Sequence, residues 1–169
     1  MVEDAIRRVG IGTDVHKLAV GGPLRLGGVD VPFDQHLSGH SDGDVVLHAV
    51  TDAILGAAGL PDIGEQFPDT DAQYEGCDSR ALLAEAMRKA GQRGYAVVNL
   101  DVVVHAERPK LSAYKRAMAE AVAGLVGLSA EGVSIKAKTN EGLDAVGRGE
   151  AIACTCVAGL TRVAEVRDR

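Results

Sequence analysis

Apolar residues recur along the chain with two periods, which together predict five strands and three helices. A period of two residues, or a continuous apolar run, marks strands at residues 8–18, 23–31, 95–106, 133–139 and 151–163. The turn-forming sequence Gly-Gly-Pro separates the first two strands, so we expect them to form a hairpin or a related antiparallel pair. The continuous Val and Leu run of the third strand predicts burial on both of its faces.

The helical period begins after Gly39 and ends before Pro61. Ser41 and Asp44 at its start resemble a capping box, in which the serine side chain would cap the helix.

Two further helices follow. The second is expected to open near Asp78 and to stop at Gly91 or Gly94, and the third spans residues 112–127. Residues 64–76 are rich in turn-forming side chains and are expected to form a loop.

This order of elements predicts the α/β class, of the α+β type. We expect one sandwich in which a mixed β-sheet carries three main helices on one face. A length of 169 residues suits a single domain. We place that domain at residues 8–163, with a flexible N-terminal lead-in at residues 1–7 and a C-terminal tail at residues 164–169.

Charge and cysteine content narrow the function classes. The chain has 18 Lys and Arg against 24 Asp and Glu, a net charge of -6, which disfavours nucleic-acid binding. Neither a membrane span of about 18 apolar residues nor the apolar core of a signal peptide is visible. Three cysteines in such a chain indicate reduced thiols and a cytoplasmic location. Cys154 and Cys156 are two apart in a strand and should both point into the core.

Asp14, His16 and His48 form a candidate metal site. Asp14 and His16 are two residues apart at the end of the first strand, so their side chains share a face, and His48 lies on the first helix. One carboxylate and two imidazoles suit Zn²⁺, and three protein ligands leave a fourth position open. The alternative is a surface pair of Asp14 and His16 beside a hydrogen-bonded helix histidine.

Other segments carry weaker candidate chemistry. His40 and Ser41 precede a helix N-terminus, which attracts phosphate. The FPDTD segment at residues 67–71 could wrap a ligand, and Lys110 at a strand end could meet a phosphate. The Gly-rich segment at residues 138–150 lacks the P-loop motif.

Taken together, the motifs resemble the 2-C-methyl-D-erythritol 2,4-cyclodiphosphate synthase family of the non-mevalonate isoprenoid pathway. The resemblance runs from about Arg8 to about Arg162. It rests on G-x-D-x-H at residues 12–16, HSDGD-x-x-x-H at 40–48, DIG at 62–64, FPDTD at 67–71, RPKL at 108–111 and GRGE at 147–150.

The resemblance implies a reaction and an assembly. The 2-phosphate of 4-diphosphocytidyl-2-C-methyl-D-erythritol 2-phosphate attacks the β-phosphorus and expels CMP, so the enzyme is classed as a phosphorus–oxygen lyase. The family is a homotrimer with active sites between neighbouring subunits. One subunit supplies the zinc cluster, and the other supplies most of the cytidine pocket.

The resemblance also implies residue roles. Asp14, His16 and His48 match the ligands of Zn²⁺ or another divalent transition metal, and Glu141 matches a ligand of the Mg²⁺ or Mn²⁺ that bridges the substrate diphosphate. The catalytic matches are His40 and Thr139, which are assigned to transition-state stabilisation. The substrate-binding matches are Asp14, Val15, His16, His40, Ser41, Asp62, Ile63, Gly64, Phe67, Pro68, Asp69, Thr70, Asp71, Ala106, Glu107, Arg108, Pro109, Lys110, Leu111, Ser112, Lys138, Thr139, Asn140, Glu141, Ala145 and Arg148.

The chain departs from the family pattern in two places. The Lys138-Thr139-Asn140 segment differs from the family's Thr-rich loop, although Thr139 is retained. Asp144 stands where a glycine is common, and Ala145 stands where an aromatic residue is common.

Two other readings use the same metal cluster. A zinc hydrolase of phosphoesters or nucleotides would need a general base, for which Asp44 or Asp62 is available. A non-enzymatic metal-binding or nucleotide-binding module would need a fourth protein ligand, for which His36 or His40 is available.

Overall fold

The computed structural model describes residues 8–39, 41–68, 70–71, 74 and 76–163. Its strands are β1 (Arg8–Val20), β2 (Leu24–Leu26), β3 (Val29–Val31), β4 (Gln35–Ser38), β5 (Tyr95–His105), β6 (Val133–Lys138) and β7 (Ala151–Arg162). Its helices are α1 (Val45–Ala58), α2 (Ile63–Gln66), α3 (Ser79–Gln92), α4 (Lys115–Val126), the 3₁₀ helix η2 (Ala130–Gly132) and α5 (Asp144–Gly147).

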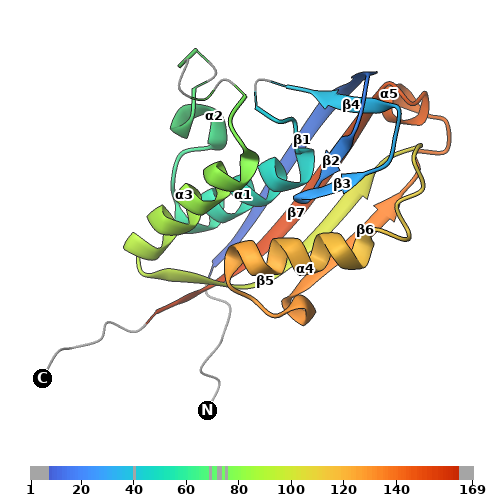
Figure 1. Cartoon of the computed structure of the whole chain (residues 1–169). Coiled ribbons are helices and arrows are strands. Elements are labelled where there is room, and N and C mark those ends of the chain that lie inside the picture. The colour runs from blue at the N-terminus through green and yellow to red at the C-terminus, as the bar shows by residue number, and fades with distance from the viewer. Residues whose placement is uncertain (1–7, 40, 69, 72–73, 75, 164–169) are drawn as a thin grey trace, which may run out of the picture.

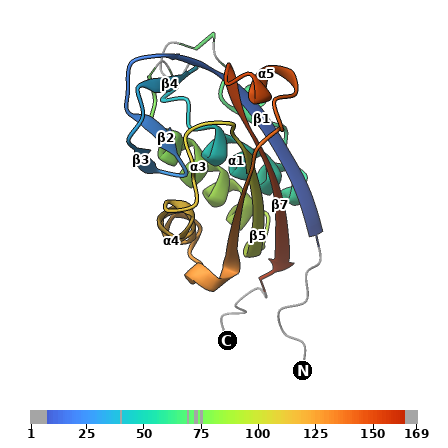
Figure 2. The same cartoon turned by 90° about the vertical axis from the view of Figure 1, so that its right-hand side faces the viewer.

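One mixed sheet organises the molecule. Its strand order is β4-β1-β7-β5-β6, in which β5 and β6 are parallel and the other neighbours are antiparallel. The long helices α1, α3 and α4 lie side by side on the same face of this sheet (Figure 1; Figure 2). They correspond to the three predicted helices, whereas the sequence did not predict the four-residue helices α2 and α5.

The strand β5 alternates between its two faces. Leu100, Val102 and Val104 are buried under the helices, while Asp101 and Val103 on the other face are half-buried. The prediction that both faces are buried is therefore wrong for the single chain, because the helices cover only one face. Cys154 and Cys156 are buried, as predicted.

Small residues bring α1 close to β1. A Cβ atom at Gly12 would lie 2.1 Å from the carbonyl oxygen of Ala49, and one at Gly10 would lie 2.0 Å from that of Ala53. Only glycine allows this approach. Because β1 extends to Val20, Asp14 and His16 lie in the middle of the strand and not at its end.

The predicted pairing of the first two strands is wrong. Residues 24–31 form their own hairpin, β2–β3, and β1 pairs instead with β4, which the sequence did not predict. The cause is the Gly27-Gly28 turn, whose φ values of 60° and 76° match a tight two-residue hairpin turn.

The start of α1 is capped by Asp44 and not by Ser41. The Asp44 carboxylate accepts hydrogen bonds from the amides of Val46 and Leu47 in α1 and from those of Gly27 and Gly28 in the hairpin. This fully buried carboxylate therefore joins the hairpin turn to the helix, and Ser41 is free for another role.

The predicted lead-in at residues 1–7 and tail at residues 164–169 lie outside the described residues. The domain boundaries at 8 and 163 remain a prediction. Among the described residues, none of the helices has the length and apolar character required to cross a bilayer.

Candidate active site

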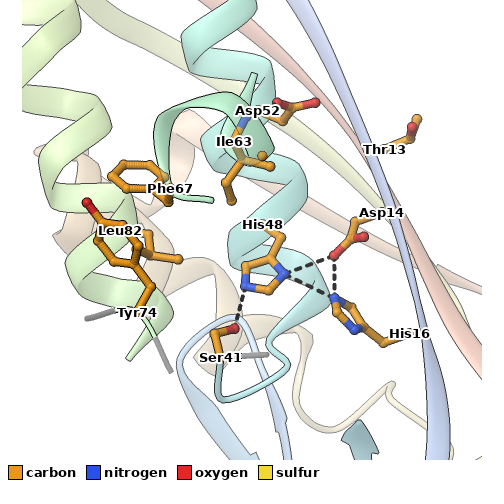
Figure 3. A pocket seen from close by; sticks show the side chains of 11 residues that line it. Thr13, Asp14, His16, Ser41, His48, Asp52, Ile63, Phe67, Tyr74 and Leu82 are labelled. Carbon is orange, nitrogen blue, oxygen red and sulfur yellow. Dashed lines mark hydrogen bonds and ion pairs between the residues drawn. The ribbon is translucent and has the colours of Figure 1, made fainter. Parts of the chain in front are cut away.

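Three side chains from two elements converge on one point (Figure 3). Asp14 Oδ2 lies 2.7 Å from His16 Nε2 and 3.0 Å from His48 Nδ1. The two histidine nitrogens are 3.1 Å apart. One ligand atom from each residue lies within 4.8 Å of the others, so the three residues form a group that could hold a metal ion.

The alternation of β1 and the close approach of α1 create this cluster. Asp14 and His16 are two apart in β1 and face α1, from which His48 points toward them. The other nitrogen of each ring is also held. His16 Nδ1 lies 3.0 Å from the Ser38 carbonyl oxygen, and His48 Nε2 lies 2.9 Å from the Ser41 hydroxyl. Such contacts orient metal-binding imidazoles.

The electrostatics favour a charged carboxylate in this cluster. Burial alone would raise the pKa of Asp14, but hydrogen bonds and positive charge from His16 and His48 outweigh it and hold that pKa well below its usual range. The hydrogen bond to Asp14 raises the pKa of His16 despite partial burial. One carboxylate with two imidazoles fits the donor chemistry of Zn²⁺.

A pocket of about 290 Å³ adjoins the cluster. Its far wall is apolar and comes from Ile63, Phe67, Tyr74 and Leu82, with His48 between this wall and Asp14 (Figure 3). The rings of Phe67 and Tyr74 meet edge to face, with centroids 5.5 Å apart. An apolar wall opposite a polar cluster is typical of small-molecule sites.

Asp52 fixes the wall contributed by α2. One turn after His48 on α1, its carboxylate accepts a hydrogen bond of 3.0 Å from the Ile63 amide. Burial raises the pKa of Asp52, although that hydrogen bond opposes the shift. The N-cap of α2 is Asp62, which accepts from the Glu65 amide.

A second group of predicted residues gathers where β5 and β6 end. The Ala106 amide donates to the Lys138 carbonyl, and the Asn140 amide donates to Glu107 Oε2. Thr139 donates its hydroxyl to Glu141 Oε1 at 2.6 Å. These residues do not line the pocket beside His48, so within the described chain the predicted site falls into two separate groups.

The remaining predicted residues are distributed as follows. Ser41, Ile63, Gly64 and Phe67 line the pocket with the metal cluster. The Val15 side chain is 60% exposed on the helix-free face of the sheet, away from the pocket. His40 and Asp69 lie outside the described residues.

Sequence reasoning missed several lining residues. Asp52, Thr13, Tyr74 and Leu82 line the pocket, and Ser79 touches His48. Only Asp52 carried a signal, because it follows His48 at helical spacing. Thr13 stands at an unspecified position of the G-x-D-x-H motif, Leu82 and Ser79 belong to a distant helix, and Tyr74 follows the FPDTD segment in a stretch without a motif.

Comparison with known proteins gives one consistent result. The model of the YgbB family matches residues 7–161. A 2-C-methyl-D-erythritol 2,4-cyclodiphosphate synthase of Bordetella petrii is 56% identical over 155 residues, which are 92% of this chain and 96% of the relative.

Two solved structures share the fold. One, titled as a 2C-methyl-D-erythritol-2,4-cyclodiphosphate synthase in a form with bound CDP, aligns with a TM-score of 0.84 and 38% identity over 91% of this chain and 100% of that one. The bifunctional IspDF of Campylobacter jejuni aligns with a TM-score of 0.88 and 41% identity over 92% of this chain. This chain spans only 42% of that bifunctional protein. The chain therefore belongs to the YgbB family, and its relatives in that family are 2-C-methyl-D-erythritol 2,4-cyclodiphosphate synthases.

Proposed function

We propose that this protein converts 4-diphosphocytidyl-2-C-methyl-D-erythritol 2-phosphate into 2-C-methyl-D-erythritol 2,4-cyclodiphosphate and CMP. The observation that carries the proposal is the convergence of Asp14, His16 and His48 beside a small pocket. Relatives that are more than half identical are named for this activity, and a related synthase structure is of the form with bound CDP.

The proposed reaction is that of a phosphorus–oxygen lyase. An oxygen of the 2-phosphate forms a new bond to the β-phosphorus, and the bond from that phosphorus to the bridging oxygen breaks. CMP leaves with that oxygen and its electron pair, and no water is consumed. This chemistry needs neutralised and aligned phosphates and not a side-chain nucleophile.

Each group of residues has a part in this reaction. Asp14, His16 and His48 would hold Zn²⁺, and Glu141 would hold Mg²⁺ or Mn²⁺ on the diphosphate. These ions, when bound, polarise phosphoryl oxygens and template the two reacting phosphates. Thr139 would donate a hydrogen bond to charge that develops on the phosphoryl group, and His40 is assigned the same task.

The pocket accounts for one end of the substrate. Its volume of about 290 Å³ lies just below the range of about 300–1,000 Å³ for sites that enclose a drug-sized ligand. This space suits the methylerythritol phosphate end, with Ile63 and Phe67 against its carbon skeleton. Residues 106–112 and 138–148 would then bind the cytidine and diphosphate.

We propose further that the protein is a homotrimer whose active sites lie between neighbouring subunits. The helix-free face of the sheet is apolar, since Val9, Ile11 and Val15 are 65%, 65% and 60% exposed there. Ile11 lies directly opposite Val157, so the apolar surface continues from β1 to β7. Apolar patches of this kind mark protein–protein contacts. The separation of the site into two groups within one chain also suits a shared site.

We place the reaction in the cytoplasm. Cys77, Cys154 and Cys156 are all free thiols, as expected in a reducing compartment.

Phosphorus NMR of the purified protein with substrate, Zn²⁺ and Mg²⁺ tests the function. We expect two coupled cyclic diphosphate resonances and an equal amount of CMP. His48→Ala should abolish turnover, whereas the matched control His36→Ala, on β4 and bonded to the Gly21 carbonyl, should leave it intact. Inorganic phosphate with an open-chain product would show a hydrolase instead. A folded, metal-loaded protein without turnover would point to a binding module.

A further inference from the structure

His48 of the metal cluster is hydrogen-bonded to a series of buried polar side chains. Ser79 and Asp42 form this series, and neither is one of the three proposed metal ligands. Ser79 is the first residue of α3 and is fully buried. Its Oγ lies 2.9 Å from His48 Nε2, on the side of the ring opposite Asp14. A buried hydroxyl at this place must satisfy both its donor and its acceptor capacity.

Asp42 accepts the hydrogen bond that the Ser79 hydroxyl donates. The Ser79 hydroxyl donates to Asp42 Oδ1 in a very short contact, and the Ser79 amide donates to Asp42 Oδ2 at 3.3 Å. Asp42 is itself largely buried, with 14% of its side chain exposed, and Arg25 Nη1 lies 3.6 Å from its Oδ2. The carboxylate therefore holds Ser79 by two hydrogen bonds.

This arrangement determines the direction of the hydrogen bond between Ser79 and His48. A carboxylate only accepts, so the Ser79 proton points to Asp42 and the serine lone pairs accept from His48 Nε2. Without a metal ion, the Asp14 carboxylate also accepts from His48, at Nδ1. A metal ion would take the Nδ1 lone pair, and the one N–H of the neutral ring would then be on Nε2, facing Ser79.

We propose that Ser79 and Asp42 are positioning residues that hold His48 in its Nε2–H form and present Nδ1 to the metal. The inference rests on the proposed metal site. Ser41 also lies 2.9 Å from His48 Nε2, but it is less buried, and its oxygen also receives the Gly43 amide. Among the described residues, Ser79 also contacts a carboxylate, that of Asp42, whereas Ser41 does not.

Zinc affinity of the full-length protein is the first test. Loss of a group that orients a metal-binding histidine typically costs 10- to 100-fold in affinity. We therefore expect Ser79→Ala to raise the Kd for Zn²⁺ about 10- to 100-fold in a chelator competition. Ser129→Ala is the matched control, because Ser129 is exposed and makes no capping hydrogen bond at η2. Ser79→Thr keeps the hydroxyl and should restore much of the affinity.

The Nε2 proton of His48 is the second test. Proton–nitrogen NMR of the Zn²⁺-loaded protein detects this proton and its rate of exchange with water. We expect a slowly exchanging Nε2–H in the wild type and a faster exchanging one in Ser79→Ala. A merely structural serine would leave this signature unchanged. If Ser79→Ala does not fold, Asp42→Asn weakens the same series of hydrogen bonds and is measured in its place.

The outcomes separate the two proposals. Wild-type Zn²⁺ affinity and unchanged exchange of the His48 Nε2 proton in Ser79→Ala would overturn the positioning role while leaving the metal site in place. A wild-type protein that binds no Zn²⁺ would overturn the metal site.

Discussion

Asp144 shows how one residue accommodates a backbone that favours glycine. Its φ is 56°, in the left-handed region, which favours glycine. The Asp144 side chain offsets this strain, because Oδ1 accepts from the Val146 amide at 2.8 Å and Oδ2 accepts from Asn140 Nδ2 at 2.9 Å. Short polar side chains tolerate this conformation through such local bonds.

Substitution of Asp144 separates the two effects. Asp144→Ala keeps the strain and loses the hydrogen bonds of the carboxylate, so we expect the free energy of unfolding to fall by about 1–2 kcal/mol. Asp144→Gly loses the bonds but relieves the strain, so its loss should be smaller. Urea unfolding of both variants measures the difference. An alanine variant as stable as the glycine variant would show that strain is unimportant here.

The cysteines differ in burial, and we expect them to differ in reactivity for that reason. Burial raises the pKa of Cys156 to about 12 and raises the pKa of Cys154 well above its usual value, so both remain protonated at pH 8. The thiolate is the reactive form. We expect one thiol, Cys77, to react rapidly with Ellman's reagent in the native protein, and three after denaturation. Rapid reaction of all three in the folded state would contradict the buried environment of β7.

The sequence predicted the residues of the metal cluster better than the residues that support them. Asp14 and His16 are linked by strand periodicity, which is a local property. Ser79 and Asp42 meet across 37 positions of sequence, and no local pattern encodes their contact. Supporting residues of a site therefore needed the three-dimensional structure.

At the scale of elements, local periodicity predicted α1, α3, α4 and the long strands. It failed where a short turn decides the pairing. The Gly27-Gly28 turn closes the β2–β3 hairpin, and β1 is then left to pair with β4. Ser41 does not cap α1, because the helix begins at Val45 and the carboxylate of the preceding Asp44 accepts from its first amides and also from the hairpin. Both errors concern contacts between elements, which composition does not reveal.

The contact between β1 and α1 sets the position of His48 relative to Asp14. A methyl group at Gly12 would meet the Ala49 carbonyl at 2.1 Å, so Gly12→Ala must push the helix away. We expect a loss of at least about 2 kcal/mol in unfolding free energy, together with weaker Zn²⁺ binding. Calorimetry and metal titration of the variant check both effects.

Gly56 provides the matched control for Gly12. It lies in α1, is exposed, and a Cβ there would meet nothing within 4 Å. Gly56→Ala should therefore stabilise the protein by about 0.5–1 kcal/mol through helix propensity, with Zn²⁺ binding unchanged. If Gly12→Ala behaved like Gly56→Ala, the close approach of α1 would not matter for the site.

At the scale of the whole molecule, β1 and β5 carry apolar side chains on the helix-free face of the sheet. These side chains are uncovered in the single chain, although their sequence suggests burial, and contact with another subunit would cover them. We expect a species of three times 17.5 kDa in analytical ultracentrifugation. Ile11→Asp should weaken each interface by about 2 kcal/mol or more and shift the protein toward monomer. Val20→Asp is the control, because Val20 is 90% exposed at the end of β1 on the other face.

A shared active site makes a quantitative prediction about mixed assemblies. His48→Ala removes the metal group and Glu141→Ala removes the other group, so each variant alone should be inactive. In mixed trimers an intact site needs one Glu141→Ala subunit to supply the metal group and a neighbouring His48→Ala subunit to supply the rest. With equal random assembly the chance is one half times one half, so co-expression should restore about a quarter of wild-type activity. A site complete within one chain would restore none, because every chain then carries a defect.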